Sequence, residues 1–172
     1  MIKIKTQGGM SLLEILVVIS IFAVLGILVT QSVVLTLKGS KKSESMVKAR
    51  ENLDYSLSII ERQIRSASSI TSPCPNPGAD KSISYLDQNG NSGSFSCEGT
   101  MGSIGSFIAS GSGNLRLTND TVKVASCSFT CTPGTMTNPS LITVDVALQE
   151  AAATSIQSAK VSATTQIYLR NY

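Results

Sequence analysis

The fold is decided by residues 8–37, which read GGMSLLEILVVISIFAVLGILVTQSVVLTL. The stretch begins with the last two residues of a short cationic leader, and apolar side chains fill most of the remainder. The apolar run exceeds the roughly 20 residues that a helix needs to cross a bilayer. One carboxylate, Glu14, lies near its start. Because an ionisable group inside a membrane span is costly, we expect Glu14 to be functional and to meet a partner of opposite charge.

The nine residues at the start of the chain have the composition of a removable segment. They carry Lys3 and Lys5 and no acidic residue. Gly8 and Gly9 end this segment, and two glycines give an unhindered backbone that a protease can hold extended. We therefore expect cleavage directly after Gly9, which leaves Met10 as the new terminus.

The residues from Gly9 to Glu14 resemble the processing site of class III signal peptides in type IV pilins and pseudopilins. The resemblance rests on the coincidence of leader, glycine, glutamate and apolar run. It implies cleavage by a prepilin peptidase and N-methylation at Met10. It also implies that Glu14 meets the terminal ammonium of a neighbouring subunit, because paired charges offset part of each other's desolvation in a low-dielectric bundle. Met10 and Glu14 are therefore the expected assembly residues.

Two other interpretations of the apolar run explain fewer of its residues. A secretory signal has a shorter apolar region, followed by small residues at its cleavage site, whereas this run continues to Leu37. A plain signal anchor, in which Glu14 reaches toward the headgroups, leaves the adjoining pair of glycines unexplained.

Composition argues against enzymatic and nucleic-acid-binding functions. The chain has 172 residues and a net charge of +3, and it contains no histidine. Removal of the leader leaves 12 basic against 11 acidic residues, which is not the balance of a nucleic-acid-binding protein. Without histidine, neither Ser-His-Asp nor Cys-His catalysis is available. We expect no enzymatic activity and no cofactor.

Four cysteines, Cys74, Cys97, Cys127 and Cys131, all follow the apolar run. This placement fits disulfides in an oxidising space outside the cytoplasm. The sequence leaves several connectivities open, and the one with the shortest loops joins Cys74 to Cys97 and Cys127 to Cys131. A four-cysteine zinc site is the alternative, but no C-x-x-C pair occurs and the spacing is irregular.

Charges around the span give two opposing signals for its orientation. The leader lysines favour a cytoplasmic N-terminus by the positive-inside rule, whereas Lys38, Lys41 and Lys42 crowd the other end. The cysteines and the processing site both place the C-terminal part outside. We expect a single-pass protein of the cytoplasmic (inner) membrane with an extracytoplasmic head, which later enters a pilus or pseudopilus. The three lysines are expected to form a solvated helix face, and the alternative is that they rest against anionic headgroups just outside the membrane.

Beyond the span, a second helical pattern has one apolar stripe and one charged face. Glu44 with Lys48, and Glu61 with Arg65, stand at the four-residue spacing that supports a helix. No proline occurs before Pro73, so both patterns fit one helix of about 85 Å. The stripe consists of Met46, Ala49, Leu53, Leu57, Ile60, Ile64 and Ala67.

The sequence predicts an α+β, pilin-like protein, with a long N-terminal helix packed on a C-terminal antiparallel β-sheet. Four segments are expected. They are a cleaved leader over 1–9, a transmembrane and assembly helix over 10–38, an amphipathic helix over 39–70, and a disulfide-containing β-rich head over 71–172.

Alternating apolar and polar residues predict the strands of the head. Residues 82–87 and 92–97 flank Asn89 and Gly90, a strong hairpin signal. Residues 115–118 and 122–129 likewise predict a second hairpin.

The segment between these hairpins, residues 99–114, is rich in glycine and serine and predicts a surface loop. Two further strands are expected around residues 142–148 and 161–169. The closing residues 163–171 also resemble the C-terminal strand of minor pilins and minor pseudopilins.

One segment partly fits a calcium loop. Asp87, Asn89, Asn91 and Glu98 take the first, third, fifth and twelfth positions of an EF-hand-like spacing. However, Ser92 stands where a glycine is expected, and the hairpin explains the segment without a metal. These residues are weak calcium candidates, and no bound metal is expected.

The second half of the span lacks the proline that major pilins and major pseudopilins commonly carry. We therefore expect a minor pilin or minor pseudopilin, a structural subunit of a type IV pilus, a type II secretion apparatus or a competence filament. The alternative is a membrane-anchored binding, adhesion or DNA-uptake module. The expected partners are prepilin peptidase, other pilin-like subunits through the N-terminal helix, and membrane lipid before assembly.

Overall fold

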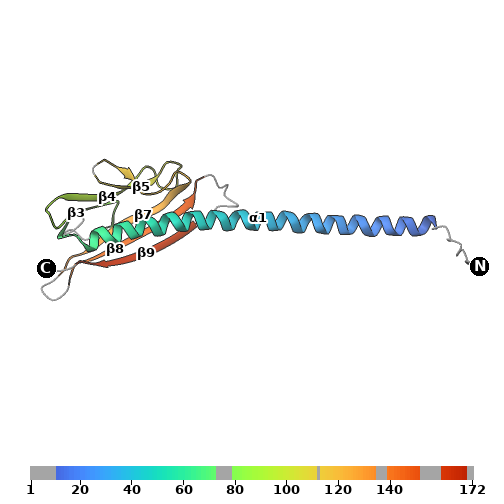
Figure 1. The fold of residues 1–172 in the computed structure, drawn as a ribbon, viewed down its shortest axis with the longest axis horizontal. Coiled ribbons are helices and arrows are strands. Elements are labelled where there is room, and N and C mark those ends of the chain that lie inside the picture. The colour runs from blue at the N-terminus through green and yellow to red at the C-terminus, as the bar shows by residue number, and fades with distance from the viewer. Residues whose placement is uncertain (1–10, 73–78, 112, 135–138, 152–159, 170–172) are drawn as a thin grey trace, which may run out of the picture. The chain divides into compact units, whose positions relative to one another are not determined.

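The computed structural model describes residues 11–72, 79–111, 113–134, 139–151 and 160–169. These residues form one long helix followed by antiparallel strands (Figure 1). The predicted α+β, pilin-like architecture is therefore confirmed. Contacts within the chain divide it into two compact units, residues 1–40 and 41–172.

Helix α1 runs without a break over Leu12–Arg65. Ser11 directly precedes it, and its carbonyl accepts the N–H groups of Glu14 and Ile15 at 3.0 and 3.2 Å. Serine is among the residues favoured at the N-cap, the non-helical residue that directly precedes a helix. In the last turn, Arg62 and Arg65 complement the negative end of the helix dipole.

The amphipathic helix is expected to cover residues 39–70, but α1 ends at Arg65. Strand β1 (Ser69–Ser72) occupies the last of these positions and pairs with β3. The Ser68 N–H donates to the Leu86 carbonyl at 2.8 Å. Because serine competes for hydrogen bonds outside the helix, this serine-rich segment joins the sheet before the prolines are reached.

In the first unit, the apolar side chains of α1 from Leu12 to Leu37 are exposed. By length and composition, α1 is the one helix among the described residues that could cross a membrane. The hydroxyls of Ser20, Thr30 and Thr36 donate to carbonyls in the preceding turn at 2.8 to 2.9 Å. These bonds satisfy the hydroxyls within the helix, as a hydrocarbon environment requires.

The second unit contains two antiparallel sheets. The strand order is β1–β3–β4–β5–β6 in the first sheet and β2–β7–β8–β9 in the second. Figure 1 shows the second half of α1 running alongside β7, β8 and β9. The remaining strands are β2 (Ala79–Asp80), β3 (Ser82–Leu86), β4 (Ser92–Glu98), β5 (Phe107–Ser110), β6 (Leu115–Arg116), β7 (Val122–Thr132), β8 (Leu141–Glu150) and β9 (Lys160–Tyr168).

The first predicted hairpin is confirmed as β3 paired with β4. Gly90 has a φ of 81°, a left-handed conformation that glycine adopts without strain. One carboxylate oxygen of Asp87 accepts the N–H groups of Asn89 and Asn91, both at 2.8 Å. The turn is therefore held by a side chain as well as by its backbone.

The second predicted hairpin is wrong. Strand β6 pairs with β5 in the first sheet, whereas β7 pairs with β2 and β8 in the second. The segment between β6 and β7 crosses from one sheet to the other, and Thr118 is buried there. Its hydroxyl oxygen accepts the Ile108 N–H at 3.2 Å, which fixes the crossing segment against β5.

The predicted surface loop over 99–114 contains a strand of the first sheet. Strand β5 pairs with β4 and β6, and both Ile108 and Ala109 on it are fully buried. The four residues of β5 are too short a segment to show periodicity within a glycine- and serine-rich sequence.

The two C-terminal strands are confirmed as β8 and β9, which pair without a register shift. Strand β8 lies inside the sheet, and β9 is an edge strand. The four alternating residues of β8 are almost fully buried, as predicted: Ile142, Val144, Val146 and Leu148.

The core lies between the second half of α1 and both sheets. Ala49, Leu53, Ile60 and Ile64 of the predicted stripe are almost completely buried. Met46 is an exception, because it is 45% exposed. The buried residue at this level of the helix is its neighbour, Ser45, which sequence hydrophobicity could not indicate.

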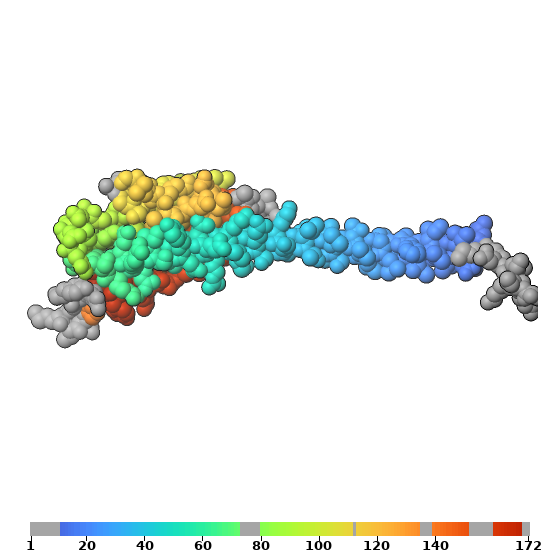
Figure 2. Space-filling view, viewed as in Figure 1, coloured from blue at the N-terminus to red at the C-terminus, as the bar shows by residue number. Residues whose placement is uncertain are grey.

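The charged face of α1 is exposed between the first sheet and β9 (Figure 2). The predicted ion pairs Glu44–Lys48 and Glu61–Arg65 both form. A third pair at the same spacing joins Arg50 and Asp54.

Candidate functional site

The start of α1 presents an exposed carboxylate. Glu14 lies in the first turn, where a negative charge is favoured by the helix dipole. Among the described residues, no basic side chain forms an ion pair with Glu14. Gly9 and Met10, the predicted processing residues, lie outside the described part of the chain. The Glu14 carboxylate is thus available to a group on another molecule.

The helix segment after Glu14 has apolar side chains on every side. The four consecutive side chains from Ile15 to Val18 face different directions around the helix, and each is between 42% and 62% exposed. A helix that is apolar all round belongs in a membrane or in the core of an assembly. By contrast, the part of α1 in the second unit buries one stripe and exposes charges.

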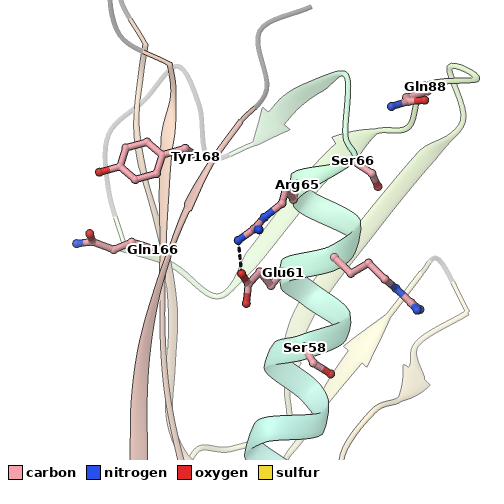
Figure 3. Close-up of a pocket in the computed structure, with 8 residues that line it drawn as sticks. Ser58, Glu61, Arg65, Ser66, Gln88, Gln166 and Tyr168 are labelled. Atoms are coloured by element: carbon pink, nitrogen blue, oxygen red, sulfur yellow. Dashed lines mark hydrogen bonds and ion pairs between the residues drawn. The ribbon is translucent and has the colours of Figure 1, made fainter.

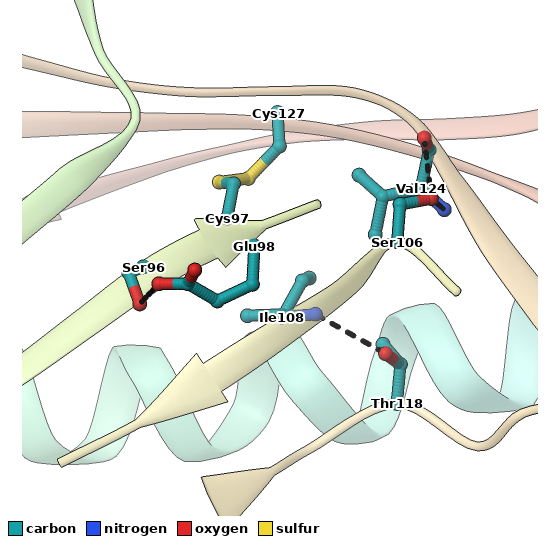
Figure 4. The surroundings of a disulfide bond; sticks show 8 residues. All are labelled: Ser96, Cys97, Glu98, Ser106, Ile108, Thr118, Val124 and Cys127. Carbon is teal, nitrogen blue, oxygen red and sulfur yellow. Dashed lines mark hydrogen bonds between the residues drawn. A yellow bond between two sulfur atoms is a disulfide. The ribbon is translucent and has the colours of Figure 1, made fainter. Parts of the chain in front are cut away.

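Cys97 on β4 and Cys127 on β7 form a disulfide that joins the two sheets (Figure 4). Their Cα atoms are 6.2 Å apart, and 30 positions separate them in sequence. The expected local pairing is therefore wrong. Cys131 is also disulfide-bonded, and the fourth cysteine, Cys74, lies outside the described residues.

The geometry of β7 explains why the local pairing fails. Cys127 and Cys131 lie on this one strand, and a strand rises about 3.3 Å per residue. Their Cα atoms are therefore about 13 Å apart, well beyond the roughly 7 Å that a disulfide can bridge. The sequence could not reveal this, because the predicted strand ended before Cys131.

The calcium candidates do not come together. Asp87, Asn89 and Asn91 share the β3–β4 turn, whereas Glu98 ends β4, about 20 Å further along at 3.3 Å per residue. Glu98 accepts a hydrogen bond from the Ser96 hydroxyl at 2.7 Å. Within the described ranges, no group of three or more His, Cys, Asp or Glu residues could hold a metal.

Asp87 instead serves the turn. Hydrogen bonds from the backbone N–H and then the side-chain amide of Asn91 lower the pKa of Asp87 below its usual value. These bonds favour the charged form of the carboxylate. The EF-hand-like spacing is thus explained by a hairpin cap.

A groove of about 710 Å³, lined by polar residues, lies over the last turns of α1 (Figure 3). Its floor is the exposed face of the helix, where Glu61 and Arg65 are joined by a hydrogen bond. The sequence indicated this charged helix face but not the residues from other elements that complete the groove. The lining residues are Ser58, Glu61, Arg62, Arg65, Ser66, Gln88, Gln166 and Tyr168.

Comparison with known proteins identifies the N-terminal segment. Residues 4–30 match the family model of the prokaryotic N-terminal methylation motif. This match supports the interpretation of the chain as a type IV pilin-like prepilin. The resemblance found in the residues between Gly9 and Glu14 is therefore confirmed. The motif implies processing by a prepilin peptidase and assembly with other pilin subunits. No curated protein and no solved structure matches the chain.

Proposed function

We propose that this chain is a minor pilin or minor pseudopilin, a non-catalytic structural subunit of a type IV pilus, a type II secretion apparatus or a competence filament. The observation that supports the proposal best is the methylation motif over residues 4–30, which leads into a helix with apolar side chains on all sides. The minor rank is favoured by the absence of proline from the apolar part of α1.

In the proposed mechanism, cleavage after Gly9 removes the leader and frees the amine of Met10. Glu14 then lies about one helical turn from the new terminus. Its carboxylate pairs with the terminal ammonium of a neighbouring subunit. Because removal of either partner leaves a buried charge unpaired, the pair selects correctly processed subunits for assembly.

The proposed path of the chain starts in the cytoplasmic membrane. The N-terminus faces the cytoplasm, α1 crosses the bilayer once, and the disulfide-containing head lies outside. During assembly, the apolar helix leaves the lipid and joins a bundle of similar helices. This exchange of one apolar environment for another costs little, provided that Glu14 finds its partner.

The processing step is tested by mass spectrometry of the mature N-terminus in cells that contain a prepilin peptidase. The unmodified chain should begin at a methylated Met10. Gly9→Val should leave the full precursor, because a branched side chain hinders access of the peptidase to the extended backbone. Gly8→Ala is the control and should still be cleaved. Unchanged processing and unchanged assembly of Gly9→Val would contradict the proposal.

A further inference from the structure

The apolar part of α1 ends where the far surface of a membrane would begin. The run from Ile15 to Leu37 is about 34 Å long at 1.5 Å per residue, against a hydrocarbon core of about 30 Å. Lys38 is the next residue, and Lys41 and Lys42 follow within one turn. If Glu14 lies near one surface of the bilayer, these three lysines lie at the other.

The three lysines occupy one face of α1. Their spacing of three and four residues places their side chains on the same side of the helix, and all three are exposed. The same spacing continues into Ser45 and Ala49, which are buried against the head. We call Lys38, Lys41 and Lys42 the basic collar.

Among the described residues, no acidic side chain forms an ion pair with a lysine of the basic collar. The nearest glutamate in sequence, Glu44, is held by the Lys48 ammonium at 2.7 Å. The other two ion pairs of α1 lie further along the helix and leave out all three lysines. The charge of Lys41 acts on Glu44 only as a smaller effect beside that of Lys48. The collar therefore carries three positive charges that no ion pair holds, on the side of the span where the positive-inside rule disfavours them.

We infer that the basic collar binds the anionic phosphate headgroups of the extracytoplasmic leaflet while the subunit waits in the membrane. The inference rests on the membrane stage of the proposed function. Two observations assign this partner: the charge of the collar is complementary to anionic lipid, and the collar directly continues the membrane-spanning surface. Each lysine close to an anionic surface strengthens binding on the order of fivefold at low ionic strength.

Lipid binding gives the collar a role in assembly. It fixes the depth of α1 in the bilayer and so keeps Glu14 at the opposite surface, where the N-terminus of a neighbour is found. When α1 leaves the membrane, the headgroups must be released. Anionic lipid therefore holds the subunit in its membrane-embedded state before assembly.

The inference is tested with the full chain in nanodiscs of phosphatidylcholine that contain a minor fraction of phosphatidylglycerol. Electron spin resonance of spin-labelled lipids measures how strongly each lipid associates with the protein. The unmodified chain should prefer phosphatidylglycerol on the order of tenfold or more. The variant Lys38→Gln/Lys41→Gln/Lys42→Gln should lose this preference, and high salt should weaken it in the unmodified chain.

The matched control is Lys81→Gln/Lys123→Gln/Lys160→Gln, which removes the same charge from the head and should keep the preference. The inference is overturned if the collar variant keeps its preference, or if the control loses as much. It is also overturned if the unmodified chain shows no preference for phosphatidylglycerol while the collar variant fails to enter filaments. That result would assign the collar to contacts between subunits. Failure of the proposed function would appear separately, as absence of cleavage after Gly9 or as extraction of the chain from membranes by carbonate.

Discussion

Ser106 and Val124 link the two sheets of the head through a buried hydrogen bond. The Ser106 hydroxyl oxygen accepts the Val124 N–H at 2.9 Å, and both residues are almost completely buried (Figure 4). Val124 lies beside a register irregularity in β7. Its carbonyl accepts the Gly102 N–H at 2.7 Å. The segment between β4 and β5 thus supplies partners to a strand of the other sheet where the strand ladder is interrupted.

Ser106→Ala should destabilise the head by about 1–3 kcal/mol, because it leaves a buried N–H without its acceptor. Urea unfolding of the full chain in mild detergent, followed by circular dichroism, measures this change. Ser103→Ala, at an exposed position of the same segment, should cost much less. Equal costs for the two variants would show that the buried bond contributes nothing.

Removal of the inter-sheet disulfide should cost about 3–4 kcal/mol, the value expected when a bond closes a loop of about 30 residues. Cys97→Ala/Cys127→Ala should therefore unfold at a lower urea concentration than the unmodified chain. Peptide mapping of the unreduced protein should find Cys97 linked to Cys127, and Cys74 linked to Cys131 in a second pair. A map that joins Cys127 to Cys131 would contradict the arrangement of β7.

Glu14→Gln should leave cleavage intact and reduce incorporation into filaments more than about tenfold. Removal of one member of a buried charge pair costs about 3–5 kcal/mol, because the other charge stays unpaired. The measurement is the ratio of cleaved chain in the filament and membrane fractions. Glu51→Gln, at an exposed glutamate of the same helix, is the control and should assemble normally. Normal assembly of Glu14→Gln would refute the proposed pairing.

The stability of the head should fall at high pH through Tyr85. Burial raises the pKa of Tyr85 above its ordinary 10.0, and the negative charge of Asp87 adds to this effect. The native state therefore keeps the phenolic proton to a higher pH than the unfolded chain does. The stabilisation is complete below pH 10.0 and is lost as pH rises through the folded pKa.

The contribution of Tyr85 is isolated by comparing Tyr85→Phe with Tyr55→Phe, because Tyr55 is exposed. Urea unfolding below and above pH 10 should show a smaller loss of stability for Tyr85→Phe than for Tyr55→Phe. Identical pH dependence in the two variants would show that Tyr85 is not the group responsible.

Gly93→Ala should destabilise the β3–β4 hairpin by about 1–3 kcal/mol, the usual cost of overpacking. Gly93 lies opposite Tyr85 in the register, and a Cβ atom there would overlap the tyrosine ring. Gly113→Ala is the control, because a Cβ at Gly113 meets nothing within 4 Å. Thermal unfolding followed by circular dichroism measures the change. Equal melting temperatures for the two variants would contradict the expectation.

Prediction from sequence succeeded where the signal was local. Helix α1 follows from its apolar run, from the helical periodicity after that run and from its lack of proline, and the β3–β4 hairpin follows from Asn89 and Gly90. The alternating residues of β8 likewise indicate a half-buried strand. Each of these patterns involves residues that are close together in the sequence. These elements could therefore be predicted without knowing which distant residues contact them.

Prediction failed where pairing was decided by distant residues. Nothing near Leu115 indicates that β6 pairs with β5 rather than with β7. The glycine- and serine-rich composition around Ile108 concealed a buried strand. Likewise, Glu98 fitted a calcium spacing in sequence but lies at the far end of β4 from Asp87.

The sequence by itself determined the N-terminal segment and the class of protein that it defines. The leader, Glu14 and the apolar run act through their order along the chain, and the methylation motif is likewise a linear pattern. Only the tertiary structure decided that Cys97 bonds with Cys127 and that the head consists of two sheets. These outcomes depend on which strands meet in space, because a disulfide or a strand ladder forms between neighbours in the fold, however far apart they are in sequence.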